Sequence, residues 1–156
     1  MSTVEYNKMD FFELGDKTAL ICSDPSSADA ARSALRDLGF KFHVADTAES
    51  AIERTRYTQY NCIVLHENFA GSSLRSNVFL NYFSTLPMAQ RRNSFVCLIG
   101  PSFKTLDAMQ AFAQSVHQVI NPRDLANLTA ILRKGLAEFD GLYHVYRSIL
   151  ELPQKT

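Results

Sequence analysis

No charge of either sign is in excess in this sequence. Its 156 residues include 16 lysines and arginines and 16 aspartates and glutamates, which gives a formal net charge of zero. A chain without a global positive field has no general attraction for nucleic acids or anionic membranes. We therefore expect neither among its partners.

Long apolar runs are also lacking. No stretch approaches the length of a membrane-spanning helix, and the N-terminus has no basic head followed by an apolar segment. The cysteines Cys22, Cys62 and Cys97 are odd in number and have no CxxC spacing, which argues against a disulfide framework. We expect a soluble, cytoplasmic protein with buried free thiols.

Familiar catalytic motifs are missing as well. The sequence contains no GxSxG elbow, no Walker phosphate-binding loop and no GxGxxG turn. We therefore expect no enzymatic activity and no cofactor.

What the sequence does contain is a series of short apolar runs rich in β-branched residues. Most of them are continuous rather than alternating, which is typical of strands buried on both faces of a parallel sheet. The runs cover residues 18–22, 42–45, 62–65, 95–99 and 116–120.

Segments with helical spacing lie between and after these runs. Ser26 or Ser27 can cap the first helix and Gly39 can end it, Thr47 can cap the second, and Pro122 suits the first turn of the last. Two further helices are expected over residues 78–83 and 105–114. The spacing predicts these inward-facing side chains: Ala31, Ala34, Leu35, Leu38, Ala51, Ile52, Tyr57, Leu106, Met109, Ala113, Leu125, Leu128, Ile131 and Leu132, with Phe112 as a further candidate.

Strand and helix therefore alternate regularly along the chain. This order indicates one doubly wound α/β domain, a three-layer αβα sandwich around a five-stranded parallel sheet with right-handed crossovers. The apolar content of 46% is enough for a core on both faces of the sheet.

Several segments, in their order along the chain, are similar to a known family. They are ALICSDPSSADAARSALRDLGF followed by HVADTAESAIE, then YNCIVLHEN, then VINP. Together they resemble the two-component response-regulator receiver domain. The resemblance implies a flavodoxin-like fold with strand order 2-1-3-4-5.

The resemblance also implies where the family's metal-binding acids and phosphoacceptor would lie. The acid pair would fall at Cys22 and Ser23, with a third acid retained as Asp24, and the phosphoacceptor aspartate would be His66. A slip of one residue would instead put Glu67 at the acceptor position, but the strand pattern speaks against it.

The other pocket positions are altered too. The hydroxyl residue after the fourth strand would be Gly100, the lysine after the fifth would be Asn121, and the switch aromatic would be Gln118. Magnesium prefers several oxygen ligands, and phosphoryl transfer depends on electrostatic positioning. We therefore predict a degenerate form, a pseudo-receiver, that recognises protein partners of a signalling pathway without phosphorylation.

Two alternatives use the same strand edge. The chain could instead be a small ligand-binding, metal-binding or catalytic α/β domain that uses the pocket around Cys22, Asp24 and His66. The cysteine and the histidine alone do not complete a tetrahedral zinc site, so no metal is predicted. The last-ranked alternative keeps phosphoryl chemistry through Glu67 and Asp24.

The ends of the chain extend past the resemblance. The predicted organisation is an N-terminal arm (residues 1–16), a receiver-like domain (residues 17–136) and a C-terminal helical extension (residues 137–156). The extension carries an apolar stripe that either folds back on its own domain or contacts another chain. We predict a homodimer whose interface includes four residues of this stripe: Phe139, Tyr143, Tyr146 and Leu150.

Overall fold

The fold is organised around a parallel sheet. The computed structural model describes residues 12–13, 15–71 and 76–151. Its five strands are hydrogen-bonded in the order β2-β1-β3-β4-β5, and every neighbouring pair is parallel, which confirms the predicted topology. The strands are β1 (Thr18–Cys22), β2 (Lys41–Val44), β3 (Cys62–His66), β4 (Phe95–Ile99) and β5 (Gln118–Ile120).

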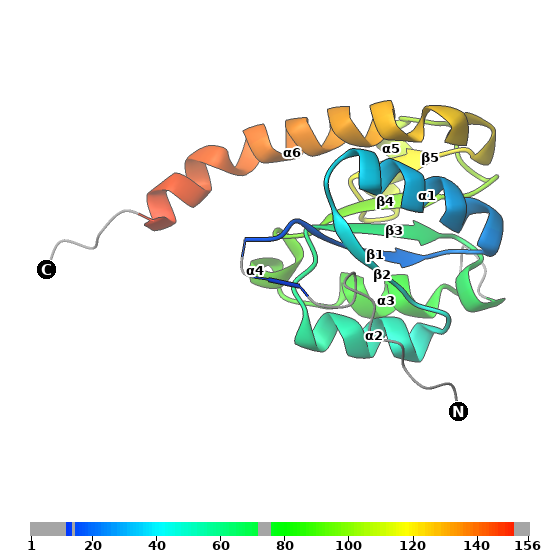
Figure 1. Ribbon diagram of the computed structural model, residues 1–156, viewed down its shortest axis with the longest axis horizontal. Coiled ribbons are helices and arrows are strands. Elements are labelled where there is room, and N and C mark those ends of the chain that lie inside the picture. The colour runs from blue at the N-terminus through cyan, green and yellow to red at the C-terminus, as the bar shows by residue number, and fades with distance from the viewer. Residues whose placement is uncertain (1–11, 14, 72–75, 152–156) are drawn as a thin grey trace, which may run out of the picture.

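Helices cover both faces of this sheet (Figure 1). One buried cluster joins the sheet to α1 and α6, and the other joins it to α2, α3 and α5. The helices are α1 (Pro25–Asp37), α2 (Ala48–Tyr57), α3 (Val78–Ser84), α4 (Met88–Arg91), α5 (Ala108–Ala113) and α6 (Leu128–Glu151), with short 3-10 turns η2 (Phe69–Gly71) and η3 (Pro122–Asn127). The result is the expected three-layer αβα sandwich.

Several helix ends follow the local sequence. Gly39 has φ +81°, the left-handed conformation expected after a helix, and the Thr47 hydroxyl accepts a hydrogen bond from the Ser50 N–H at 3.1 Å. The first helix starts earlier than predicted. Pro25 occupies its first turn, so Asp24 rather than Ser26 or Ser27 is the N-cap residue.

The prediction of which side of the fourth helical segment, residues 105–114, faces the core is wrong. Met109 and Phe112 are 75% and 81% exposed, Leu106 is 51% exposed, and Ala113 is exposed too. Leu106 has φ +66° and its N–H donates to the Val119 carbonyl oxygen, so it lies before the helix. The helix α5 therefore begins later and turns Ala111 to the core instead.

Two further expectations about helices need correction. Tyr57, the last residue of α2, is 82% exposed and does not face the core. The sequence analysis also missed α4, a single turn directly after Pro87.

The last helix continues past the predicted domain boundary. α6 runs through residues 136 and 137 without a break, and its C-terminal part projects beyond the sheet (Figure 1). Gly135 lets the helix approach the sheet closely, because a Cβ there would lie 2.7 Å from Phe95 Cζ and 2.8 Å from Gln118 Nε2. At the other end of the chain, the Phe12 ring stacks on His43 with centroids 4.2 Å apart. Of the predicted arm, residues 1–11 and 14 lie outside the described residues.

Across residues 12–13, 15–71 and 76–151, no helix is both long enough and apolar enough to span a bilayer.

Candidate functional site

The candidate site lies at the carboxyl edge of the sheet, where parallel α/β folds usually bind ligands. Parallel pairing brings the ends of β3, β4 and β5 together: the Glu67 N–H donates to the Ile99 carbonyl oxygen and the Gly100 N–H to that of Ile120. Asp24 and His66 meet at this edge, with His66 Nε2 3.8 Å from Asp24 Oδ1.

Cys22 does not join them. Its side chain is fully buried in the hydrophobic cluster on the α2 and α3 face of the sheet. Burial raises the pKa of the Cys22 thiol far above its ordinary value, and the charge of Arg54 offsets this only in part. Because a thiolate is the form that binds metals, Cys22 contributes packing rather than a ligand.

Asp24 supplies a carboxylate at the carboxyl edge of the sheet, beside His66. Its partial burial favours the neutral form, but hydrogen bonds from Ser26, Ser27 and Ser23 outweigh burial and lower the pKa of the carboxyl. The Ser26 hydroxyl donates at 2.6 Å and the Ser23 hydroxyl at 3.0 Å. The carboxylate is therefore charged and already has several donors.

The two ring nitrogens of His66 face different neighbours. Nδ1 accepts a hydrogen bond from the Asn68 N–H at 3.0 Å, so in the neutral ring the proton is on Nε2, which faces Asp24. At 3.8 Å this is an electrostatic contact rather than a hydrogen bond. His66 therefore lacks the carboxylate of a phosphoacceptor, and its Nδ1 is already used as a hydrogen-bond acceptor.

Glu67 occupies the centre of the site. Its side chain is only 2% exposed, and Oε1 accepts a hydrogen bond from the Ser102 N–H at 3.0 Å. A Cβ on Gly100 would lie 2.3 Å from Glu67 Oε1 and 2.5 Å from its Cγ. The carboxylate therefore fills the space in which a residue larger than glycine would place its side chain. The sequence analysis considered Glu67 only as a displaced acceptor.

Asn77 was missed by the sequence analysis. It is buried, and its Nδ2 lies 3.2 Å from the carbonyl oxygens of both His66 and Glu67. Its Oδ1 accepts from the Leu80 N–H and so caps α3. An asparagine directly before an apolar helical segment is the signal that could have identified this cap.

Asn121, which the sequence analysis places at the family's lysine position, forms hydrogen bonds to the loop between β4 and α5. Its Nδ2 donates to the Phe103 carbonyl oxygen at 2.9 Å, and its Oδ1 accepts from the Arg123 N–H. The Thr105 hydroxyl accepts from the Asn121 N–H and donates to Asp124. Together with the Glu67 contact, these bonds fix the loop between β4 and α5.

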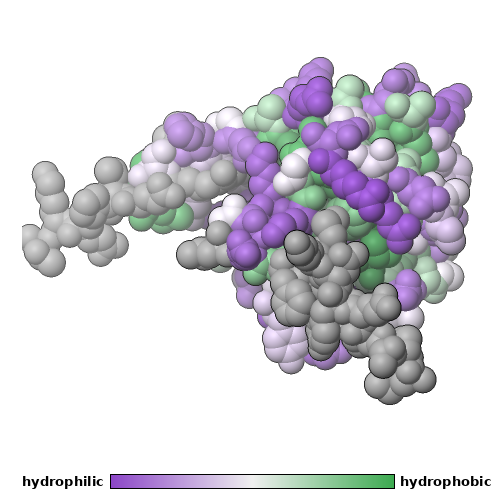
Figure 2. Space-filling view, in the orientation of Figure 1, coloured by the Kyte–Doolittle hydropathy of each residue, from purple (hydrophilic) through white to green (hydrophobic). Residues whose placement is uncertain are grey.

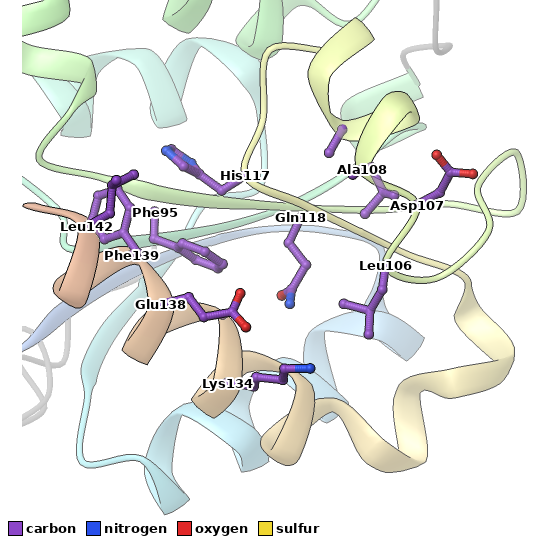
Figure 3. Close-up of a pocket in the computed structure, with 13 residues that line it drawn as sticks. Phe95, Leu106, Asp107, Ala108, His117, Gln118, Lys134, Glu138, Phe139 and Leu142 are labelled. Carbon is purple, nitrogen blue, oxygen red and sulfur yellow. The ribbon is translucent and has the colours of Figure 1, made fainter.

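Gln118, which the sequence analysis places at the switch-aromatic position, is buried between β5 and α6. Its Nε2 donates to the Ile131 carbonyl oxygen at 3.1 Å, and Figure 3 shows the side chain pointing from the strand toward the helix. Its Oε1 is buried and has no hydrogen-bond partner among the described residues. The hydrogen bond from Gln118 therefore connects β5 to α6, and the side chain is buried rather than on the surface.

A cleft of about 430 Å³ opens beside Asp24 and is lined by Arg32, Asp46 and Asn68 among others. It extends toward η2 rather than toward Gly100 or Asn121. Within the part of the chain that the structure describes, no three histidine, cysteine, aspartate or glutamate side chains are grouped closely enough to hold a metal ion.

Solved structures with the same architecture identify the fold. The chain is similar to a CheY-like response regulator receiver domain from Methanospirillum hungatei JF-1, with 11% identity, a TM-score of 0.60, and 81% of this chain and 97% of that chain covered. The receiver domain has the predicted strand order. A CheY-like receiver domain from Methylobacillus flagellatus gives 18% identity, a TM-score of 0.56 and coverage of 77% and 98%. A response regulator from Thermotoga maritima is 14% identical and has a TM-score of 0.59, with 78% of this chain and 98% of that chain covered. This chain has the receiver-domain fold.

Neither the scan of protein-family models nor the search of curated proteins gave a match. Within the receiver fold, the site of this chain therefore has to be interpreted from its own side chains. These are a charged Asp24 with its serine donors, a histidine whose Nδ1 accepts a hydrogen bond and whose Nε2 faces Asp24, and a glutamate packed against a glycine.

Proposed function

We propose that this chain is a receiver-fold module that recognises protein partners in a cytoplasmic signalling pathway and is not switched by phosphorylation. The observation that carries the proposal is the placement of Glu67. Its carboxyl group packs against Gly100 and accepts the Ser102 N–H, so the glutamate side chain already fills the place next to the β4–α5 loop. A phosphoryl group brought there would find this space occupied.

The charges around the site support the same proposal. Magnesium is held mainly by carboxylates, and an incoming phosphoryl group needs cations that neutralise it. Of the family's three acid positions, only Asp24 carries a carboxylate, and the neighbouring Glu67 is buried. Asn121 is neutral, and its amide is engaged by Phe103 and Arg123. No catalytic role or cofactor is part of this proposal.

The test is incubation with acetyl phosphate and magnesium, followed by intact-mass measurement. We expect no added phosphoryl group on the native chain, with a phosphorylatable receiver domain as the positive control in the same reaction. His66→Asp should remain unmodified as well, because Ser23 and Asn121 are unchanged. A phosphoryl adduct on Glu67 or Asp24, or recovery by the single substitution, would contradict the proposal.

The surface of α6 supports a homodimer as part of this function. Phe139 is buried against Phe95 of its own domain, with ring centroids 5.7 Å apart, so it is not free for an interface, and Tyr143 is half-buried beside it. Leu142, Ile149 and Leu150 remain 73%, 61% and 66% exposed on the same helix. Figure 2 shows hydrophobic surface on the projecting part of α6. Such a stripe is unusual on a soluble monomer, and a second copy is the simplest cover.

Light scattering tests the homodimer. Ile149→Asp combined with Leu150→Asp should convert a dimer to a monomer, whereas the neighbouring exposed substitution Ser148→Asp should not. These substitutions leave Phe139 in place, which a truncation before it would not. A native chain that is monomeric at all accessible concentrations would refute the dimer.

A second candidate function is binding of a small ligand at the strand edge. The cleft beside Asp24, with Arg32 on its wall, is the observation that favours it. Thermal melts with magnesium, zinc or inorganic phosphate test this alternative. A rise in Tm that Asp24→Asn abolishes would favour it over the interaction module.

A further inference from the structure

A different groove lies at the opposite edge of the sheet. Its volume is about 410 Å³, and its walls come from α4, the end of α5 and α6. Val116 and His117, which line it, directly precede β5, and Arg92 precedes β4. The groove is therefore at the amino ends of the strands, away from Asp24 and Glu67.

Much of the lining of this groove is apolar. Met88, Phe112, Val116 and Tyr143 contribute to it. Met88 is 53% exposed and Phe112 is 81% exposed. Large apolar side chains that gather around a concave surface, rather than standing singly, mark sites of interaction.

The rim of the groove is positively charged. Arg91 and Arg92 both line it, and no aspartate or glutamate of the described residues does. Neither arginine forms an ion pair within 4.0 Å with a carboxylate of those residues. Arg91 Nε is buried without a hydrogen-bond partner in the described part of the chain.

His117 adds no charge to the rim at neutral pH. Burial of its ring, together with the charge of Arg91, lowers the pKa of His117 to about 4. Much of the residue is exposed, but its Nδ1 accepts the Val96 N–H at 3.0 Å, and this hydrogen bond requires an unprotonated nitrogen. The positive charge of the groove is therefore that of the two arginines.

Arg92 is already held in place. Its Nε donates to the Met88 carbonyl oxygen at 3.0 Å, its Nη1 donates to the Tyr146 hydroxyl, and its guanidinium carbon lies 4.8 Å from the centre of the Tyr146 ring. Tyr146 belongs to the projecting part of α6, so the extension beyond the receiver fold builds one wall of the groove. An ordered arginine loses little freedom on binding.

We propose that this groove binds an acidic segment of a partner protein that carries an apolar anchor. Carboxylates of the segment pair with Arg91 and Arg92, and an apolar side chain packs between Met88 and Phe112. Guanidinium and carboxylate groups form strong charge-assisted hydrogen bonds, and arginines beside apolar pockets are typical of binding hot spots. This inference rests on the proposed function as an interaction module and names its class of partner.

Fluorescence anisotropy with labelled peptides tests the proposal on the full chain. The probe is a short peptide in which aspartate and glutamate alternate with leucine. One matched peptide has lysine in place of every acid, and another has serine in place of every leucine. Only the acidic leucine peptide should bind, and added salt should weaken its binding.

Three variants locate the binding. Arg91→Ala combined with Arg92→Ala should weaken binding about tenfold or more, which corresponds to about 1.4 kcal/mol. Phe112→Ser should also weaken it, and because this side chain is exposed the fold should be kept. Arg56→Ala, an exposed arginine on α2, is the matched control and should bind as the native chain does. Circular dichroism of each variant verifies that it is folded.

Equal binding of the acidic and lysine peptides, or full affinity in the double arginine variant, would overturn the proposal. So would a native chain that binds no peptide but loses self-association when both arginines are replaced, since the groove would then belong to a second copy. Failure of the proposed function is separate. It would be seen as a phosphoryl adduct in the mass measurement, which does not involve Arg91 or Arg92.

Discussion

Gly100→Ala tests how tightly the strand-edge site is packed. The new Cβ would lie 2.3 Å from Glu67 Oε1, 2.4 Å from its Cδ and 2.5 Å from its Cγ, so the glutamate side chain has to move. The φ angle of Gly100 is not in the left-handed region, so alanine brings no backbone strain of that kind. The whole cost therefore comes from the contact with Glu67.

The magnitude follows from two terms. Inserting a methyl group into a packed site costs about 1–3 kcal/mol. Displacing Glu67 also breaks its hydrogen bond to the Ser102 N–H, and a hydrogen bond to a charged group contributes about 1.5–3 kcal/mol. We expect Gly100→Ala to lower the free energy of unfolding by about 3 kcal/mol.

A double-mutant cycle with Glu67→Ala isolates this contact. Without the glutamate side chain, the methyl group introduced by Gly100→Ala would enter vacated space, so the substitution should then cost close to nothing. The coupling energy should be about 2 kcal/mol or more, well above the roughly 0.5 kcal/mol error of additivity. Urea unfolding followed by circular dichroism is the assay, because the chain has no tryptophan. Additive effects of the two substitutions would refute the reasoning.

Three further predictions concern other parts of the molecule. Gly135→Ala should destabilise the fold by about 1–3 kcal/mol, because the new Cβ would meet Phe95 and Gln118. Gly141→Ala, with nothing within 4 Å of its Cβ, should stabilise the fold by about 0.5–1 kcal/mol. Urea titrations compare the two variants, and equal effects would contradict the close approach of α6 to the sheet. The pKa of His117 in the folded state, about 4, is below its ordinary value of 6.5, so the free energy of unfolding should fall as the pH drops from about 6.5 to about 4. His117→Asn should flatten that part of the curve of stability against pH, and an unchanged slope would exclude His117 as the cause. Zinc should not raise the Tm, because the Cys22 thiol is buried and protonated, and a rise abolished by Cys22→Ser would contradict this.

The fold could be predicted from the sequence because its signals are local and repeated. Continuous apolar runs indicated strands buried on both faces, and the strands at 18–22 and 95–99 match β1 and β4 residue for residue. Gly39 and Thr47 marked helix ends through chemistry that acts within a few residues. Such patterns need no knowledge of distant contacts.

The prediction of which residues are buried was wrong in the fourth helical segment, where burial depends on the rotation of the helix about its own axis. The fourth helical segment contains apolar residues on every side, so its spacing could not select Ala111 over Met109 or Phe112 as the buried residue. The left-handed turn at Leu106 and its hydrogen bond to Val119 set that rotation, and both depend on the neighbouring strand.

The sequence by itself determined the order of strands and helices and the residue types at the strand edge, including the lack of a carboxylate at His66 and of a lysine at Asn121. Only the tertiary structure decided what replaces that chemistry. Glu67 and Gly100 are far apart in the chain, and their contact exists because parallel pairing of β3 with β4 places the two strand ends side by side. The groove at Arg91 and Arg92 likewise depends on the continuation of α6 past the sheet, since Tyr143 lines the groove and Tyr146 contacts Arg92, more than fifty residues away in sequence. Local patterns carry no information about such contacts, because these depend on how elements pack after the chain has folded.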